Sequence, residues 1–238
     1  MKTLVTVNGW HITAVVSGRS RVFLISGNRL NILVDTGPKR SWNKLKRRLK
    51  RLGIESIDYL ILTHAHFDHS SNAAKIRREF GARVVGNINE AHLLINGENA
   101  PIKGSYHILE LIVRLLSAFF VRKLRYEPCK PDIITGKFFQ FSGNIQGINV
   151  IHTPGHSEGS QSIIIDDEIA LTGDTMFGIL PWSVFPPFAL DIPELVKSWG
   201  ILLKTRCRLF LPSHGTEINR EIVEKEFRKR AGYNKDTS

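Results

Sequence analysis

Cysteine is scarce in this chain, and its scarcity excludes two kinds of small protein. Only Cys129 and Cys207 are present, and they lie far apart in the sequence. A disulfide framework or a cysteine-rich metal cluster needs several thiols at short spacing. We therefore expect two reduced thiols in a cytoplasmic protein.

Long apolar runs are also missing. Residues 1–10 contain no apolar core of signal-peptide length and no small-residue cleavage site after one. The apolar stretch from Tyr106 to Leu124 is interrupted by Glu110 and Arg114, whereas a bilayer span needs about 20 apolar residues. We expect neither export nor a transmembrane segment.

No part of the chain has a disordered or collagen-like composition. Hydrophobic residues make up 42% and charged residues 23% of the 238 positions, which is ordinary for a folded protein. A chain of this length can bury a substantial core, and no linker divides it. We expect a single domain over residues 1–238.

Acidic residues are outnumbered, because 33 Lys and Arg face 22 Asp and Glu, which gives a net charge of +11. Such a charge is compatible with nucleic-acid binding. Eight of the basic residues, however, lie between Lys39 and Arg51, where Trp42, Leu45, Leu49 and Leu52 recur at helical spacing and are expected to turn inward. This pattern predicts an amphipathic surface helix without interleaved aromatics, so nucleic acid is the weaker interpretation.

The order of short apolar runs and turn signals predicts two similar halves. In the first half the expected strands and helices are Leu4 to Val7, Thr13 to Ser17, Val22 to Ser26, Leu30 to Asp35, the basic helix, Ile57 to Thr63, a helix from Ser71 to Phe80 closed by Gly81, and Arg83 to Gly86. In the second half they are strands near Ile133, at Phe138 to Phe141, Asn149 to Ile151, Ser162 to Ile165 and Glu168 to Thr172, a helix near Pro193 to Lys204, and a strand at Arg208 to Leu211. We expect two sheets packed face to face with helices outside, and a helical insertion at about residues 89–125.

One segment concentrates potential metal ligands. His64, His66, Asp68 and His69 lie within six residues, directly after an apolar strand. Protonated imidazoles at this density would repel one another, whereas a divalent cation binds neutral imidazole and ionised carboxylate together. The segment therefore predicts a metal site.

Three further candidates also follow apolar strands: His156 in Thr-Pro-Gly-His, Asp174 in Gly-Asp-Thr, and His214 in Ser-His-Gly. If these strands share a sandwich, their ends meet along one rim. Glycines beside the three candidates would allow sharp turns or close backbone approach there. Seven donors exceed the four that one zinc takes, so they indicate two divalent cations. Zinc is the default, with iron and manganese open.

In combination and order, these motifs resemble those of the metallo-β-lactamase superfamily. The match runs from Asp35-Thr36-Gly37 to His214. The resemblance implies an α/β fold, a four-layer αββα sandwich of the metallo-β-lactamase type. It also implies that one metal is held by His64, His66 and His156, that the other is held by Asp68, His69 and His214, and that Asp174 bridges them. Asp35 matches an acidic position near the metal rim, although it could also serve only as a turn or helix cap.

The predicted activity is hydrolysis by a metal-bound hydroxide, with Asp68 as the catalytic residue that orients the nucleophile and passes a proton to the leaving group. Within the superfamily, we expect neither the export of true metallo-β-lactamases, nor the glutathione-binding helical domain of glyoxalase II, nor the glycine-rich basic arm of the RNA-processing members. The chain is most similar to the group that includes glyoxalase-like thioesterases and acyl-homoserine lactonases. An ester, thioester or lactone carbonyl in a small molecule with an apolar portion is therefore favoured. A phosphodiesterase or ribonuclease of the same superfamily is the alternative. A non-catalytic metal-binding protein is disfavoured because all seven ligand positions are intact.

Two apolar segments have open interpretations. The loop from Met176 to Phe188 follows Asp174, and either walls the pocket or packs in the core. The segment from Tyr106 to Leu124 predicts a helix that is apolar around most of its circumference. It could lie beneath other elements, pair with a second subunit in a homodimer, or cover the active site as a lid that also touches a membrane surface.

Overall fold

The computed structural model describes residues 2–18, 20–113, 115, 124–141 and 145–233. Its first sheet has seven strands, which lie side by side in chain order. Strands β1 to β4 are antiparallel neighbours, and β4 to β7 are parallel. The strands are β1 (Thr3–Val5), β2 (His11–Val16), β3 (Val22–Gly27), β4 (Leu30–Val34), β5 (Tyr59–Ile61), β6 (Arg83–Asn87) and β7 (Ile133–Thr135).

The second sheet has six strands in the spatial order β13-β12-β11-β10-β9-β8. Only the pair β11 and β12 is parallel, and the chain between them forms a helix, as a parallel crossover requires. The strands are β8 (Phe138–Gln140), β9 (Ile148–His152), β10 (Gln161–Ile165), β11 (Ile169–Gly173), β12 (Leu209–Pro212) and β13 (Ile218–Asn219).

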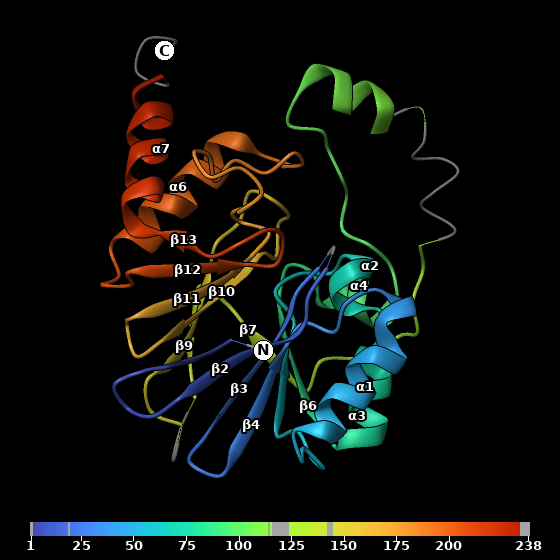
Figure 1. Ribbon diagram of the computed structural model, residues 1–238. Coiled ribbons are helices and arrows are strands. Elements are labelled where there is room, and N and C mark those ends of the chain that lie inside the picture. The colour runs from blue at the N-terminus through green and yellow to red at the C-terminus, as the bar shows by residue number, and fades with distance from the viewer. Residues whose placement is uncertain (1, 19, 114, 116–123, 142–144, 234–238) are drawn as a thin grey trace.

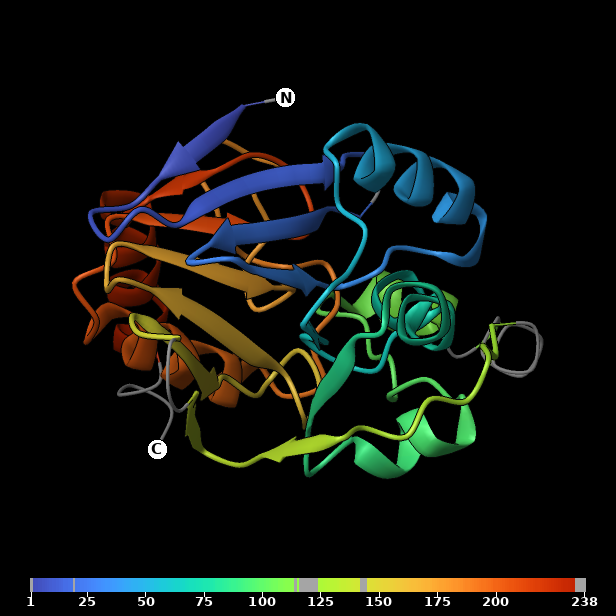
Figure 2. The ribbon, with the colours of Figure 1, turned by 90° about the horizontal axis from the view of Figure 1, so that it is seen from below.

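Helices flank both sheets, so the molecule has four layers. Figure 2 shows α1 and α3 outside the first sheet, and α6 and α7 outside the second. The helices are η1 (Lys39–Ser41), α1 (Trp42–Arg51), α2 (Phe67–Ser70), α3 (Ala73–Phe80), α4 (Ala91–Asn96), α6 (Ile192–Leu203) and α7 (Arg220–Tyr233). This arrangement is the αββα sandwich, and it confirms the predicted fold class.

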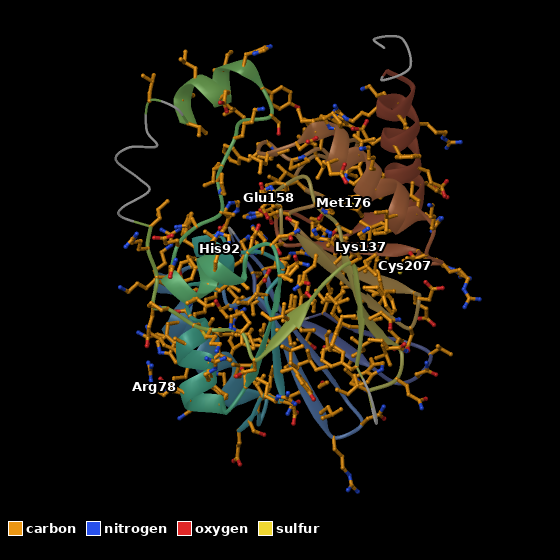
Figure 3. The ribbon with its side chains drawn as sticks, turned by 180° about the vertical axis from the view of Figure 1, so that it is seen from behind. Arg78, His92, Lys137, Glu158, Met176 and Cys207 are labelled. Carbon is orange, nitrogen blue, oxygen red and sulfur yellow. The ribbon has the colours of Figure 1, made fainter. Side chains whose placement is uncertain are left out.

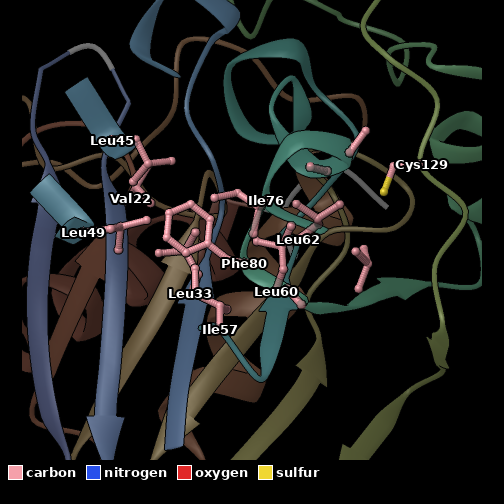
Figure 4. Packing of buried hydrophobic residues seen from close by; sticks show 14 of the residues in the cluster. Val22, Leu33, Leu45, Leu49, Ile57, Leu60, Leu62, Ile76, Phe80 and Cys129 are labelled. Atoms are coloured by element: carbon pink, nitrogen blue, oxygen red, sulfur yellow. The ribbon is translucent and has the colours of Figure 1, made fainter. Parts of the chain in front are cut away.

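Three apolar clusters hold the layers together. Between the sheets, Ile25 and Val34 of the first sheet pack with Ile163 and Leu171 of the second. A second cluster joins the first sheet to α1 and α3, with Phe80 at its centre in Figure 4. The third joins the second sheet to α6 and α7. Burial of a large aliphatic side chain contributes about 1.5–3 kcal/mol, so all three clusters stabilise the sandwich.

Capping residues determine where two of the helices begin or end. Asp191 accepts a hydrogen bond from the Glu194 N–H at 2.9 Å and so caps the start of α6. Gly81 ends α3 with a φ of 73°, a conformation that glycine adopts without a steric penalty.

The basic helix α1 ends at Arg51, and the next residue, Leu52, is 41% exposed. The expectation that Leu52 turns inward with Leu45 and Leu49 is therefore wrong.

The predicted insertion is helical in two places. The first is α4, and the second comprises residues 107–113 and 115. Residues 114 and 116–123, which include Phe119, lie outside the described residues. The second helical piece stands away from the body of the molecule in Figure 1. Ile108 and Leu111 are 76% and 60% exposed, so the described part of this segment is not packed beneath other elements.

Within the described ranges, no helix combines the length and the apolar character that a membrane crossing requires.

Candidate metal centre

The structure brings all seven predicted donor residues to one rim of the sandwich, where four segments leave their strands. The segment after β5 carries four of them and forms the short helix α2, which sequence periodicity did not reveal because it is a single turn. The other three, His156, Asp174 and His214, follow β9, β11 and β12. The prediction that distant strand ends share one site is thus met by the geometry.

Three histidines form the first cluster, and their ring nitrogens converge. The Nδ1 atom of His66 lies 2.8 Å from Nε2 of His64 and 3.1 Å from Nε2 of His156. All three side chains are buried. Their donor atoms lie within 4.8 Å of one another, a group that could hold a metal ion.

Asp68, His69 and His214 form the second cluster, also within 4.8 Å. The Nε2 atom of His214 lies 3.4 Å from Oδ2 of Asp68. Asp174 lies between the clusters: its Oδ2 is 3.2 Å from Nε2 of His214 and 3.6 Å from Nε2 of His156. Its Oδ1 is 3.4 Å from Nε2 of His69. A carboxylate in this place can contact two cations at once.

The donor atoms would be better satisfied by bound metal ions than by contacts with one another. Nε2 of His69 and Oδ1 of Asp174 are buried and have no hydrogen-bond partner among the described residues, although such atoms are costly to leave unpaired. In the first cluster, Nδ1 of His66 and Nε2 of His156 face each other at 3.1 Å, and both carry lone pairs because the other nitrogen of each ring donates to a backbone carbonyl. Divalent cations would satisfy both sets of atoms. The His and Asp clusters are therefore consistent with a binuclear metal site.

Charge distribution differs between the clusters. Burial lowers the pKa of His64 and His66, and that of His156 to about 4, which favours the neutral imidazole that a metal binds. Burial also opposes charge on His214, but Asp174 outweighs it and raises the pKa to about 9. Against burial, His69 and His214 hold the pKa of Asp174 well below its ordinary value. The carboxylate therefore stays ionised and attracts cations.

Asp35 fixes the orientation of His69. Its Oδ2 accepts a hydrogen bond from Nδ1 of His69 at 2.8 Å, so Nε2 faces the second cluster. The same carboxylate accepts from the N–H and hydroxyl of Thr63, at 2.8 and 2.9 Å. Asp35 thus does more than end a turn, because it positions a donor histidine. The sequence had placed it near the rim without a partner.

Two backbone carbonyls orient two further donor histidines, His156 and His66. Nδ1 of His156 donates to the carbonyl of Phe188 at 2.9 Å, and Nε2 of His66 donates to that of Ala100 at 3.2 Å. Each ring therefore keeps its other nitrogen toward the first cluster. Phe188 belongs to the loop after Asp174 and Ala100 to the insertion, so both segments border the centre.

Sequence reasoning missed Glu90, a buried residue at the start of α4. Its carboxylate accepts hydrogen bonds from the N–H of Ala65 at 2.6 Å and of Gly159 at 2.8 Å. Ala65 lies between two donor histidines, and Gly159 lies three residues after His156. Glu90 thus joins two donor loops, but no motif or spacing in the sequence signals this contact.

The remaining four histidines lie outside both clusters. His11, His92 and His107 are exposed, and His152 donates to the carbonyl of Glu158 at 2.7 Å. In the loop that carries His156, the hydroxyl of Ser160 accepts a hydrogen bond from the N–H of Ser157 at 3.1 Å and so stabilises the loop.

The loop from Met176 to Phe188 combines both predicted roles. Met176, which is labelled in Figure 3, and Val184 are buried in the core beside α6. Phe177 stacks on the ring of His214 with centroids 4.6 Å apart. Trp182, in contrast, is 66% exposed. The loop therefore packs partly in the core and partly against the donor residue His214.

Fold and site together define a class: an αββα sandwich with a two-part His and Asp cluster at one rim. The family model of the metallo-beta-lactamase superfamily matches residues 17–214, and the chain belongs to this superfamily as a metal-dependent hydrolase.

Similarity to individual proteins is consistent with this superfamily assignment. A probable metallo-hydrolase of Methanocaldococcus jannaschii is 34% identical over 167 residues, which cover 69% of this chain and 72% of the relative. Acyl-coenzyme A thioesterase MBLAC2 of Bos taurus is 24% identical, over 90% of this chain and 78% of its own. The crystal structure of the archaeal superfamily protein ST1585 from Sulfolobus tokodaii superposes with a TM-score of 0.66 at 19% identity, covering 95% of this chain and 87% of that one.

Proposed function

We propose that this protein hydrolyses an ester, thioester or lactone bond in a small molecule with an apolar portion, using two divalent cations. The observation that carries the proposal is the contact between Phe177 and His214, because it sets an apolar ring directly against the donor cluster. Ile179 and Leu180 continue the apolar character outward from that ring. An apolar wall suits an acyl group better than a phosphate.

The proposed ligands follow the two clusters. One cation would be held by His64, His66 and His156 and the other by Asp68, His69 and His214, with Asp174 placed between the two clusters to contact both. The convergence of ring nitrogens and the two buried atoms without a hydrogen bond support this assignment. Zinc is the proposed metal, because imidazole with carboxylate is a common zinc ligand set. The same set also accepts iron or manganese.

Two bound cations supply Lewis acidity to the substrate carbonyl and lower the pKa of the attacking water. The chain's own residues supply position and proton transfer. Asp68 is the catalytic residue, since its side chain is 20% exposed whereas that of Asp174 is 5% exposed. Burial opposes its charge, but His69 and His214 lower its pKa, so it is ionised. An ionised carboxylate has a site for the proton that the attacking water gives up. We propose that it passes this proton to the leaving group.

A phosphodiester is the second candidate, and one observation favours it. The chain carries a net charge of +11, and the basic segment begins with exposed Lys39 and Arg40, four residues after Asp35. Cations near the rim would attract a phosphate. The thioesterase among the relatives acts on an acyl-coenzyme A, and that supports the carbonyl substrate.

A substrate panel tests the proposal. The metal-loaded protein is assayed on acyl thioesters, lactones and bis(p-nitrophenyl) phosphate, with Asp174→Ala as the inactive reference. His92→Ala, which alters an exposed histidine outside the clusters, is the matched control. We expect turnover of a thioester or lactone to exceed that of the phosphodiester by tenfold or more. A higher rate on the phosphodiester would contradict the proposal.

A further inference from the structure

The helical residues 107–113 and 115 present apolar side chains to the outside. Tyr106, Ile108, Leu111, Ile112 and Leu115 are 44 to 76% exposed. A surface helix ordinarily turns polar residues outward. The acidic residue of this stretch, Glu110, bends back instead, and its carboxylate accepts a hydrogen bond from the N–H of Gly104 at 2.9 Å. Exposed apolar surface of this kind marks an interaction site.

A second exposed apolar group lies on the loop that follows Asp174. Ile179, Leu180 and Trp182 are 48 to 66% exposed. Two backbone hydrogen bonds join this loop to the insertion, from Ser105 N to the Pro187 carbonyl at 2.9 Å and from Ala189 N to the Lys103 carbonyl at 3.0 Å. The two groups of side chains together are called the outer apolar surface. Figure 1 shows both segments on the same side of the molecule, beyond the strand ends.

Basic residues flank the outer apolar surface. The last turns of α7 lie on the same side of the molecule in Figure 1. They contact the loop, because the guanidinium of Arg230 lies 3.7 Å from the ring centroid of Phe185. On this helix Arg228 and Lys229 are exposed, as is Lys103 on the insertion. In the described part of the chain no ion pair joins Arg228 or Lys229 to a carboxylate.

We propose that the outer apolar surface docks on an anionic lipid membrane. A bilayer interface accepts apolar side chains, takes the amphipathic rings of Trp182 and Tyr106 at headgroup level, and attracts the flanking cations. A second copy of this chain fits less well, since each copy carries a net charge of +11 and the two would repel. The proposed docking does not depend on which bond the metal centre hydrolyses. It would bring substrates dissolved in the membrane close to the rim of the sandwich that carries the donor residues.

Vesicle co-sedimentation tests the docking without any substrate. The metal-loaded full chain is mixed with vesicles of phosphatidylcholine alone, or of phosphatidylcholine with phosphatidylglycerol, at low and high salt. We expect binding to the anionic vesicles that weakens with salt. Ile108→Asp and Trp182→Ser should each lower the partition coefficient roughly tenfold. Val7→Asp, which alters an apolar residue of matching exposure in the β1–β2 turn, is the control and should bind like wild type.

Three results would overturn the inference. The first is no binding of the wild type to anionic vesicles at low salt. The second is an equal loss in Val7→Asp, which would show that the binding is not specific to this surface. The third is a wild-type dimer in sedimentation that Ile108→Asp dissociates, together with absent vesicle binding, which would assign the surface to a second copy. Circular dichroism shows that each variant is folded, and none of these results depends on which substrate is hydrolysed.

Discussion

At the scale of single residues, the centre depends on which nitrogen each histidine turns toward its neighbours. Asp35 and the carbonyls of Ala100 and Phe188 each occupy one ring nitrogen of a donor histidine, at 2.8 to 3.2 Å. The other nitrogen is thereby directed at a cluster. Loss of such a partner commonly costs about ten- to a hundredfold in metal affinity or activity.

Asp68→Asn tests the proposed proton transfer. The amide keeps the size of the side chain but cannot accept and return a proton, so turnover should fall roughly a hundredfold or more. Activity is measured at equal metal content, determined by elemental analysis of each sample. Asp167→Asn, which alters a carboxylate paired with Arg206, is the control. Unchanged turnover in Asp68→Asn would leave this residue only a ligand role.

Glu90→Gln tests the link between two donor loops. A carboxylate accepts from both Ala65 N and Gly159 N, whereas an amide has one acceptor oxygen and would set an N–H against a donor. We expect a loss of about 1–3 kcal/mol in unfolding free energy. Metal should also dissociate faster in the presence of a chelator. Glu158→Gln, an exposed change in the same loop, is the control. Metal loss at the wild-type rate would mean that Glu90 contributes stability alone.

At the scale of elements, glycines let the donor loops approach one another. Gly155, Gly173 and Gly215 all have positive φ values, of 123°, 54° and 91°. A Cβ at Gly215 would lie 2.1 Å from the carbonyl carbon of Gly178. The backbone of the His214 loop therefore packs against that of the Phe177 loop, as their hydrogen bond from Gly178 N to the His214 carbonyl at 2.8 Å also shows.

Gly215→Ala is expected to push these two loops apart. The added methyl group clashes with backbone, and the positive φ adds strain, so we expect a loss of about 1–3 kcal/mol. Metal retention should fall as well, because His214 is the preceding residue. Gly136→Ala has open space around its Cβ and is the matched control in thermal unfolding. Equal melting temperatures for the two variants would contradict the close-packing argument.

The sequence predicted elements where the apolar pattern was strong and missed them where it was weak. Strands such as β10 and β11 are buried along their whole length, and the apolar residues Ile163 to Ile165 and Ile169 to Leu171 mark them in the sequence. The helix α7 was not predicted, since its charged residues dilute the apolar face formed by Val223 and Phe227. The donor residues could be predicted because their types and spacing carry the chemistry. Glu90 could not, because its contacts depend on tertiary structure.

At the scale of the whole molecule, both sheets contribute to one core. Phe23 of β3 and Trp10, which lies in the turn before β2, share an apolar cluster with Val150 and Ile165 of the second sheet. Neither half could bury its inner face alone. We propose on this ground that residues 1–238 act as a single domain. The donor loops then meet because the two sheets are fixed against each other.

The metal content of the active protein tests the central claim most directly. The purified chain is stripped with a chelator, titrated with zinc, iron or manganese, and assayed after each addition on its best substrate. We predict no turnover in the stripped protein, and a rise that is complete at two equivalents per chain. Asp174→Ala should bind less metal and stay inactive. Full activity in the stripped protein, or saturation at one equivalent with a second site that never fills, would contradict the binuclear hydrolase described above.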